Sequence, residues 1–229
     1  MRRTLLALCA LVVVLGGCTR GEPEEPLRTF EPQQTASSPS PKPQLGKDSK
    51  ACTLLTAKDR RSIAGEKIEV VAPVQLLKGV LQCRWVKTLK TPVTTSIKVI
   101  SQPVQTWVLG VPKQIDQSIQ RGRVEDKYLG RLQAAKKKII REGGEISDAD
   151  ACRIFSLLVE VNQERKNETE FVLFEGTTRG DYTAAWNTCK GGVHTALTYE
   201  EPSLVPSEAL SNAVVRLGKL AHKRALKIL

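Results

Sequence analysis

The sequence predicts an α+β domain in which an antiparallel sheet packs against amphipathic helices and which is cross-linked by two disulfides. Apolar residues recur at three- and four-residue steps along 113–141 and again after Ser207, which favours helices. Segments that alternate or are rich in β-branched residues favour strands at 80–86, 94–102, 171–176, 182–189 and 192–200. Four cysteines in the same part of the chain predict the disulfides.

The helices carry start and stop signals. Thr56 can cap a short helix over 57–64, and Gly65 can end it. The pattern of 113–141 should break near Gly122 and stop at the glycine pair 143–144. The last helix should begin near Ser207 and bury the stripe Leu210, Val214, Leu217 and Ala221.

The strands are separated by turn residues, and one segment is ambiguous. Pro103 should end the strand at 94–102, and Lys190-Gly191-Gly192 should join the last two strands in a hairpin. Segment 151–161 has the β-branched and aromatic residues of a strand. Asp148 or Asp150 could instead cap a helix there, so both interpretations remain open.

Six cysteines divide into three groups. Cys9 belongs to the N-terminal leader and Cys18 follows it, which leaves Cys52, Cys83, Cys152 and Cys189 for two disulfides. Three connectivities are open, and sequential pairing closes loops of about 30 and 37 residues. In a plain meander a strand starting at Cys152 and one ending at Cys189 place the two thiols at opposite ends. We retain sequential pairing and doubt the simple meander.

The N-terminus predicts export and lipid anchoring. Arg2 and Arg3 precede an apolar run of 11 residues, which is too short to span a membrane and typical of a signal peptide over 1–17. Leu15-Gly16-Gly17-Cys18 is typical of a bacterial lipobox, in which Cys18 receives diacylglycerol. An ordinary signal peptide that happens to contain a cysteine is the alternative, and the two arginines are also a weak twin-arginine signal.

Residues 18–50 should form a disordered, proline-rich tether, because they hold half of the prolines and few large apolar residues. Residues 51–229 should then form one extracytoplasmic domain, or two lobes over 51–145 and 146–229. "KACTLL" and "DACRIF" each precede a later cysteine, a strand, a proline and an amphipathic helix. This similarity could result from an internal duplication, or it could be only the general pattern of two α+β lobes.

The positive charge is concentrated in two predicted helical segments. The chain carries a net charge of +11, of which residues 113–141 contribute +6 and residues 205–229 contribute +4. We expect an anion-binding surface from these segments. The alternative is an ordinary solvated surface whose cations match the helix dipoles. The candidate residues are Lys136, Lys137, Lys138, Arg141, Arg216, Lys219, Lys223 and Lys227.

No catalytic or metal-binding pattern stands out. The folded part lacks Gly-x-Ser-x-Gly, Ser-x-x-Lys and Cys-x-x-Cys motifs and a phosphate-binding glycine loop. Only His194 and His222 are present, and both are expected at the surface. We therefore predict a protein that is not an enzyme and that uses no cofactor and no metal.

Three stretches carry a resemblance to a known family: "ACTLLTAKDRRSIAG" (51–65), "CRW" followed by the strand "SIKVI", and the closing segment 205–225. The chain resembles a family of actinobacterial secreted lipoproteins of unknown function. Their domains open with a cysteine, two leucines and a short helix, place Cys-x-Trp on a strand, and close with an Ala/Leu-rich helix. The resemblance implies an α+β domain on the cell envelope with no established chemistry.

Together these patterns predict a membrane-anchored lipoprotein that binds an anionic cell-envelope component. The candidate partners are the membrane, through the lipid anchor, and an anionic polymer or a membrane protein. The alternative function is a regulatory or accessory partner of a membrane sensor or transporter. Nucleic acid is excluded as a partner, because export opposes it and an aromatic content of 4% leaves few stacking platforms.

Overall fold

The computed structural model describes residues 44–229 except 90–94, 164–165, 176–181 and 203. The predicted signal peptide, Cys18 and most of the predicted tether lie outside these residues. The fold begins before residue 51, because strand β1 (Leu45–Gly46) pairs with β3 (Val74–Gln75). The last residues that we assigned to the tether therefore belong to the folded unit.

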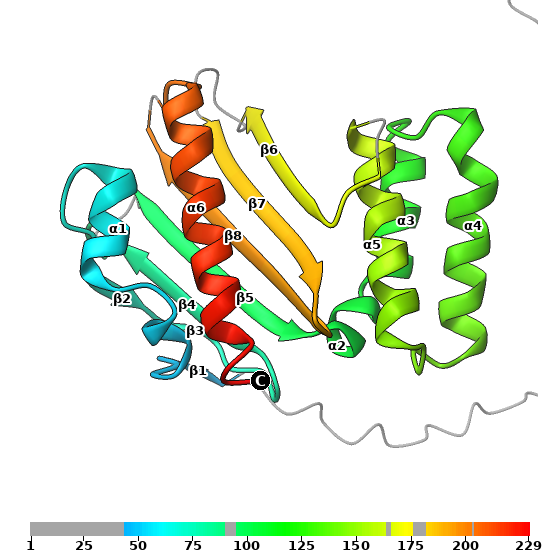
Figure 1. The fold of residues 1–229 in the computed structure, drawn as a ribbon, viewed down its shortest axis with the longest axis horizontal. Helices are drawn as coiled ribbons and strands as arrows, with labels where there is room; N and C mark the ends of the chain where they lie inside the picture. The colour runs from blue at the N-terminus through cyan, green and yellow to red at the C-terminus, as the bar shows by residue number, and fades with distance from the viewer. Residues whose placement is uncertain (1–43, 90–94, 164–165, 176–181, 203) are drawn as a thin grey trace, which may run out of the picture. The chain divides into compact units, whose positions relative to one another are not determined.

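The predicted α+β class is confirmed by one six-stranded antiparallel sheet with helices packed against it (Figure 1). The strand order across the sheet is β2 (Val70–Ala72), β4 (Leu81–Val86), β5 (Ser96–Pro103), β8 (Val193–Glu201), β7 (Tyr182–Lys190) and β6 (Thr169–Glu175). The central β5–β8 pair joins the strands of 51–145 to those of 146–229, so the two segments share one sheet.

The β7–β8 hairpin forms where the sequence predicts it. Gly191 and Gly192 both have positive φ angles, 60° and 74°. A two-residue turn of this kind matches the twist of the flanking strands, and glycine adopts it without steric cost. The hairpin sets the register that places Cys189 opposite His194.

One face of the sheet is covered by η1 (Ala51–Thr53), α1 (Ala57–Ala64) and α6 (Glu208–Ala225). Neighbouring strands align Cys83, Val99, Leu197 and Trp186 in one row, and all four belong to this core. Trp85, Trp186 and Tyr199 are its largest fully buried side chains. In Figure 1, α6 runs across this face of the sheet.

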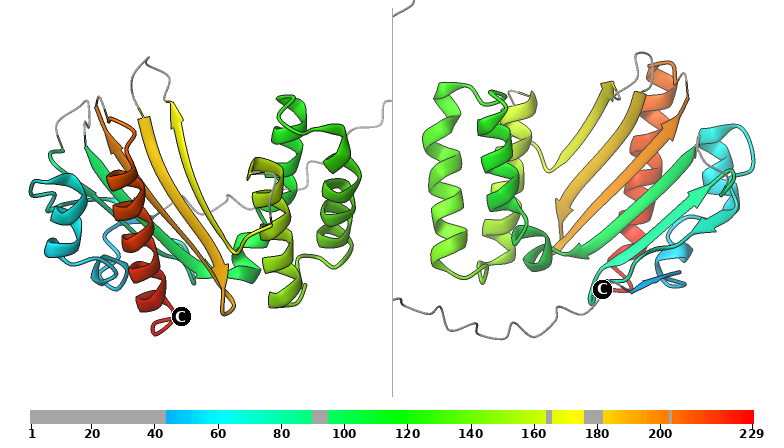
Figure 2. Two further views of the ribbon diagram at one scale, coloured as in Figure 1. Left: turned by 45° about the horizontal axis from the view of Figure 1, so that its top comes forward. Right: turned by 180° about the vertical axis from the view of Figure 1, so that it is seen from behind.

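A second core lies among the four helices that follow β5 and precede β6 along the chain (Figure 2). These helices are α2 (Val104–Val108), α3 (Val111–Gln120), α4 (Asp126–Arg141) and α5 (Asp148–Gln163). Cys189 is the sheet residue that enters this core, and His194 stacks beside it on Trp107 of α2. Asn162 and Gln163 of α5 also donate hydrogen bonds to the carboxylate of Glu170 and the carbonyl of Phe171, which joins the helical layer to β6.

Both expected disulfides are present, as Cys52–Cys83 and Cys152–Cys189. Residues 151–161 lie in helix α5, so the strand interpretation of that segment is wrong. The doubt about the meander was also misplaced, because β6, β7 and β8 do form one. Cys152 lies on helix α5, outside the sheet, and binds Cys189 of β7 from there. The two thiols are therefore not held at opposite ends of the sheet, as two strands would have required. Cys83 and Cys189 lie in different cores, so the two bridges are not equivalent.

The predicted helix ends agree with the structure because they depend on local chemistry. Thr56 and Asp59 form a reciprocal capping box at the start of α1, and Gly65 ends it in the left-handed region. Ser207 caps α6 through the backbone N–H of Leu210. The break near Gly122 separates α3 from α4. Within the described residues, no helix is long and apolar enough to cross a membrane.

Candidate anion-binding surfaces

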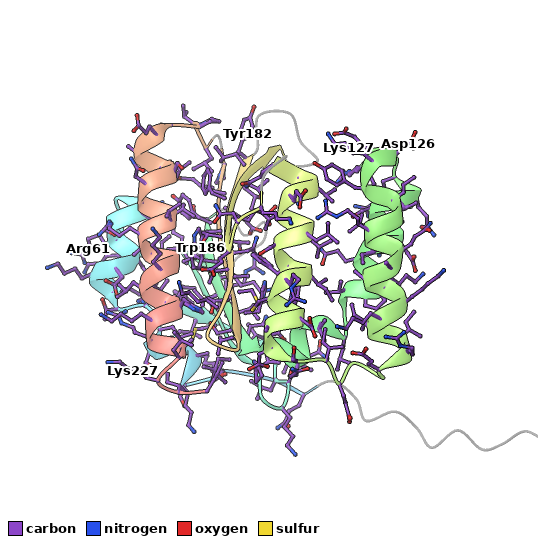
Figure 3. All side chains as sticks on the ribbon, turned by 45° about the vertical axis from the view of Figure 1, so that its right-hand side comes forward. Arg61, Asp126, Lys127, Tyr182, Trp186 and Lys227 are labelled. Carbon is purple, nitrogen blue, oxygen red and sulfur yellow. A yellow bond between two sulfur atoms is a disulfide. The ribbon has the colours of Figure 1, made fainter. Side chains whose placement is uncertain are left out.

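Four cations on and after α6 form an exposed row, which we call the α6 cationic stripe. It consists of Arg216, Lys219, Lys223 and Lys227, spaced at three or four residues so that they share one side of the helix. No carboxylate among the described residues forms an ion pair with any of them. Arg216 donates a hydrogen bond to Ser62 Oγ at 3.0 Å. Figure 3 shows Lys227 at one end of α6.

Helix α1 lies beside α6 and extends the positive surface. Lys58 and Arg61 of α1 are exposed, and Arg61 points away from the protein in Figure 3. The nearby carboxylate of Asp59 is neutralised by Arg224, whose Nη1 lies 2.6 Å from its Oδ2. Burial alone raises the pKa of Asp59, but the hydrogen bonds from Arg224 and Thr56 lower it below its ordinary value. Asp59 is therefore paired with Arg224 and does not neutralise the positive charge of the stripe.

The predicted cations of α4 are placed differently. Lys136 lies 2.6 Å from Asp116, Lys138 lies 2.9 Å from Asp150, and Arg141 contacts the adjacent Glu142. Lys137 is exposed and has no ion-pair partner among the described residues. The two predicted clusters do not form one surface, because α6 covers the sheet and α4 belongs to the helical layer (Figure 1).

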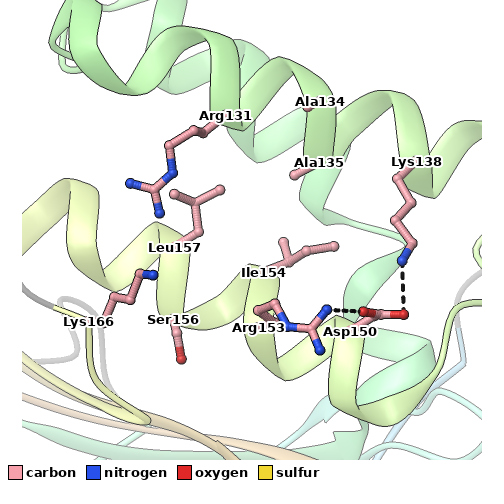
Figure 4. Close-up of a pocket in the computed structure, with 10 residues that line it drawn as sticks. All are labelled: Arg131, Ala134, Ala135, Lys138, Asp150, Arg153, Ile154, Ser156, Leu157 and Lys166. Atoms are coloured by element: carbon pink, nitrogen blue, oxygen red, sulfur yellow. Dashed lines mark hydrogen bonds and ion pairs between the residues drawn. The ribbon is translucent and has the colours of Figure 1, made fainter.

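A groove runs between α4 and α5, which we call the α4–α5 groove (Figure 4). Its volume is about 400 Å³. Apolar side chains form its floor and charged side chains its rim. The lining residues are Arg131, Ala134, Ala135, Lys138, Asp150, Arg153, Ile154, Ser156, Leu157 and Lys166.

Both histidines are buried, so the expectation that they lie at the surface is wrong. His194 is 7% exposed and stacks on Trp107 at 4.9 Å between ring centroids, with Phe155 at 5.7 Å. Burial, and to a lesser degree the charge of His222, lowers the pKa of His194 to about 3. The alternation along β8 is correct, but helices α2 and α5 cover the face that carries His194.

His222 lies on the opposite face of β8, in a chain of hydrogen bonds. Its Nδ1 is 2.9 Å from the hydroxyl of Thr195, which is 3.0 Å from the hydroxyl of Ser101. Burial, and then the charge of Lys190, lowers the pKa of His222. Ser101 and Thr195 are fully buried, so this chain holds β5, β8 and α6 together and does not face solvent.

Within the described residues, no group of three or more His, Cys, Asp or Glu side chains could hold a metal ion. Sequence reasoning missed the buried Arg60, which donates hydrogen bonds to the carbonyls of Ile68 and Leu55 and stacks over Trp85. It is a structural cation, and only the tertiary structure distinguishes it from the exposed ones.

Comparison of the chain with models of known protein families, with curated proteins and with solved structures finds no match.

Proposed function

We propose that the protein is a lipid-anchored, non-enzymatic module that binds an anionic component of the cell envelope through the α6 cationic stripe. The anchor would be the diacylglyceryl group on Cys18, which holds the module on the outer face of the membrane. The observation that carries the proposal is the contrast between two sets of cations. Those of the stripe have no carboxylate partner among the described residues, whereas three of the four on α4 do.

The contrast matters because an unpaired cation exchanges only water and counterions for a ligand. A cation already held by a carboxylate must give up that partner first. Consecutive stripe residues are separated by three or four positions, which is about 5 Å along a helix axis. A row of this kind favours a linear polymer that carries negative charges at intervals, more than a single compact anion.

The test uses the chain from residue 18, with Cys18→Ser so that no lipid is attached, prepared under oxidising conditions. The protein is sedimented with isolated cell envelopes while the salt concentration is raised. We expect the bound fraction to fall steeply between about 0.05 and 0.5 M salt, because screening weakens contacts between exposed charges. Saturable binding that persists at high salt would instead indicate a protein partner, and absence of binding would refute the proposal.

A further inference from the structure

The α4–α5 groove has an apolar floor, and it is hollow because α4 presents small residues there. Ala134 and Ala135 face Ile154 and Leu157 of α5 across the groove. Ile154 and Leu157 are almost fully buried, whereas Ala134 is exposed. A larger side chain at the alanine positions would fill the space between the helices. The hollow therefore results from the sequence of α4 and has a volume in the range of small-ligand sites.

Ion pairs between α4 and α5 bound both ends of the floor. Arg131 binds Glu160 through both terminal nitrogens, at 2.7 and 2.8 Å. At the other end, Lys138 Nζ lies 2.9 Å from Asp150. The two ends are separated by seven residues of α4, which is about 10 Å.

The two ends differ in their capacity for another anion. Both terminal nitrogens of Arg131 already bind the carboxylate of Glu160. Arg153 contacts Asp150 through Nη1, and its side chain is 74% exposed. Figure 4 shows this contact, and the remaining N–H groups form no other hydrogen bond with the described residues. Each end carries one cation more than its carboxylate can balance, because Lys166 lines the groove beside Arg131 and Glu160. The unused N–H groups of Arg153 therefore distinguish this end as the site for a further negative group.

We propose that the α4–α5 groove binds a single-chain fatty carboxylate, with its chain on the alanine floor and its carboxylate at Arg153. The planar edge of a guanidinium with free N–H groups matches a carboxylate in two parallel hydrogen bonds. The chain covers the apolar floor, and Lys138 adds a second positive charge near the head. This site is separate from the α6 cationic stripe and does not depend on the proposed function.

The test is calorimetric titration of the Cys18→Ser chain from residue 18 with decanoate, whose chain is about as long as the floor. We expect one molecule bound per chain. Ala134→Phe should weaken binding at least tenfold, because the ring occupies the floor, and Arg153→Gln should weaken it at least fivefold. Arg121→Gln, which removes an exposed cation elsewhere, should leave the affinity unchanged. Ala134 and Arg153 are exposed, so both variants should fold, and circular dichroism checks this.

Two amphiphiles with the same chain test the head group. Decyltrimethylammonium should not bind, because its head is repelled by Arg153 and Lys138. Equal binding of this cation, or undiminished binding of decanoate by Ala134→Phe, would overturn the proposal. Tighter binding of decyl phosphate than of decanoate would overturn the assignment to a carboxylate.

Discussion

Acidification should destabilise the fold through His194, and the size of the effect follows from its burial. The imidazole has a pKa of about 3 in the folded chain and an ordinary value of 6.5 when unfolded. Below pH 6.5 the unfolded chain therefore binds a proton that the folded chain does not. The contribution of His194 to the free energy of unfolding is fully present above pH 6.5 and is lost as the pH falls toward 3.

Between pH 7.5 and pH 5.0 the expected loss is about 2 kcal/mol from this residue alone, since each unit of pKa difference is worth about 1.4 kcal/mol. The groups that face His194 are the rings of Trp107 and Phe155 and, through the sheet, the imidazole of His222. None of the three is a carboxylate that could stabilise the imidazolium.

The assay is urea unfolding followed by tryptophan fluorescence at both pH values, for the natural chain and for His194→Phe. Phenylalanine keeps an aromatic ring against Trp107 and removes the titrating nitrogen. The variant should lose about 2 kcal/mol less than the natural chain on acidification, and its slope with urea should stay the same. Equal losses in both proteins would refute the account of His194.

Two further predictions concern the packing of each core. Gly218→Ala should lower the free energy of unfolding by about 1–3 kcal/mol despite the better helix propensity of alanine, because the new Cβ would lie 2.1 Å from Trp186 Cε3; urea unfolding measures this, and a stabilised variant would contradict the packing. Cys152→Ser with Cys189→Ser opens a loop of 37 residues and should cost about 2–4 kcal/mol. In this double variant, hydrogen exchange should show α5 losing protection before α6, because the lost bridge links α5 to the sheet. Simultaneous loss in both helices would contradict the division into two cores.

The features predicted from the sequence are those that depend on neighbouring residues. The capping box at Thr56, the turn at Gly191 and Gly192, and the stripe on α6 are each set within a few positions. Helix α2 was not predicted, because five residues carry too little periodicity to distinguish them from the end of a strand. The helix at 151–161 was ambiguous because its buried face against the second core gives it the composition of a strand.

The environment of the charged residues could not be predicted in the same way. Lys136 and Asp116 are 20 positions apart, and Lys138 and Asp150 are 12 apart, so their pairing depends on how α3, α4 and α5 pack. The burial of His194 depends on α2 and α5 covering one end of the sheet. The sequence therefore indicated where cations gather, and the structure indicates which of them have carboxylate partners.

If the α6 cationic stripe is the proposed contact surface, reversing its charge should abolish binding, whereas an equal change of charge elsewhere should not. Lys219→Glu with Lys223→Glu reverses two charges of the stripe, and Lys113→Glu with Lys137→Glu makes the same change in net charge on α3 and α4. Sedimentation of both variants with cell envelopes at low salt, after circular dichroism has confirmed folding, measures the bound fraction. We expect the stripe variant to lose at least nine tenths of its binding and the matched variant to retain most of it. Equal losses would mean that net charge alone drives association, and undiminished binding of the stripe variant would contradict the claim.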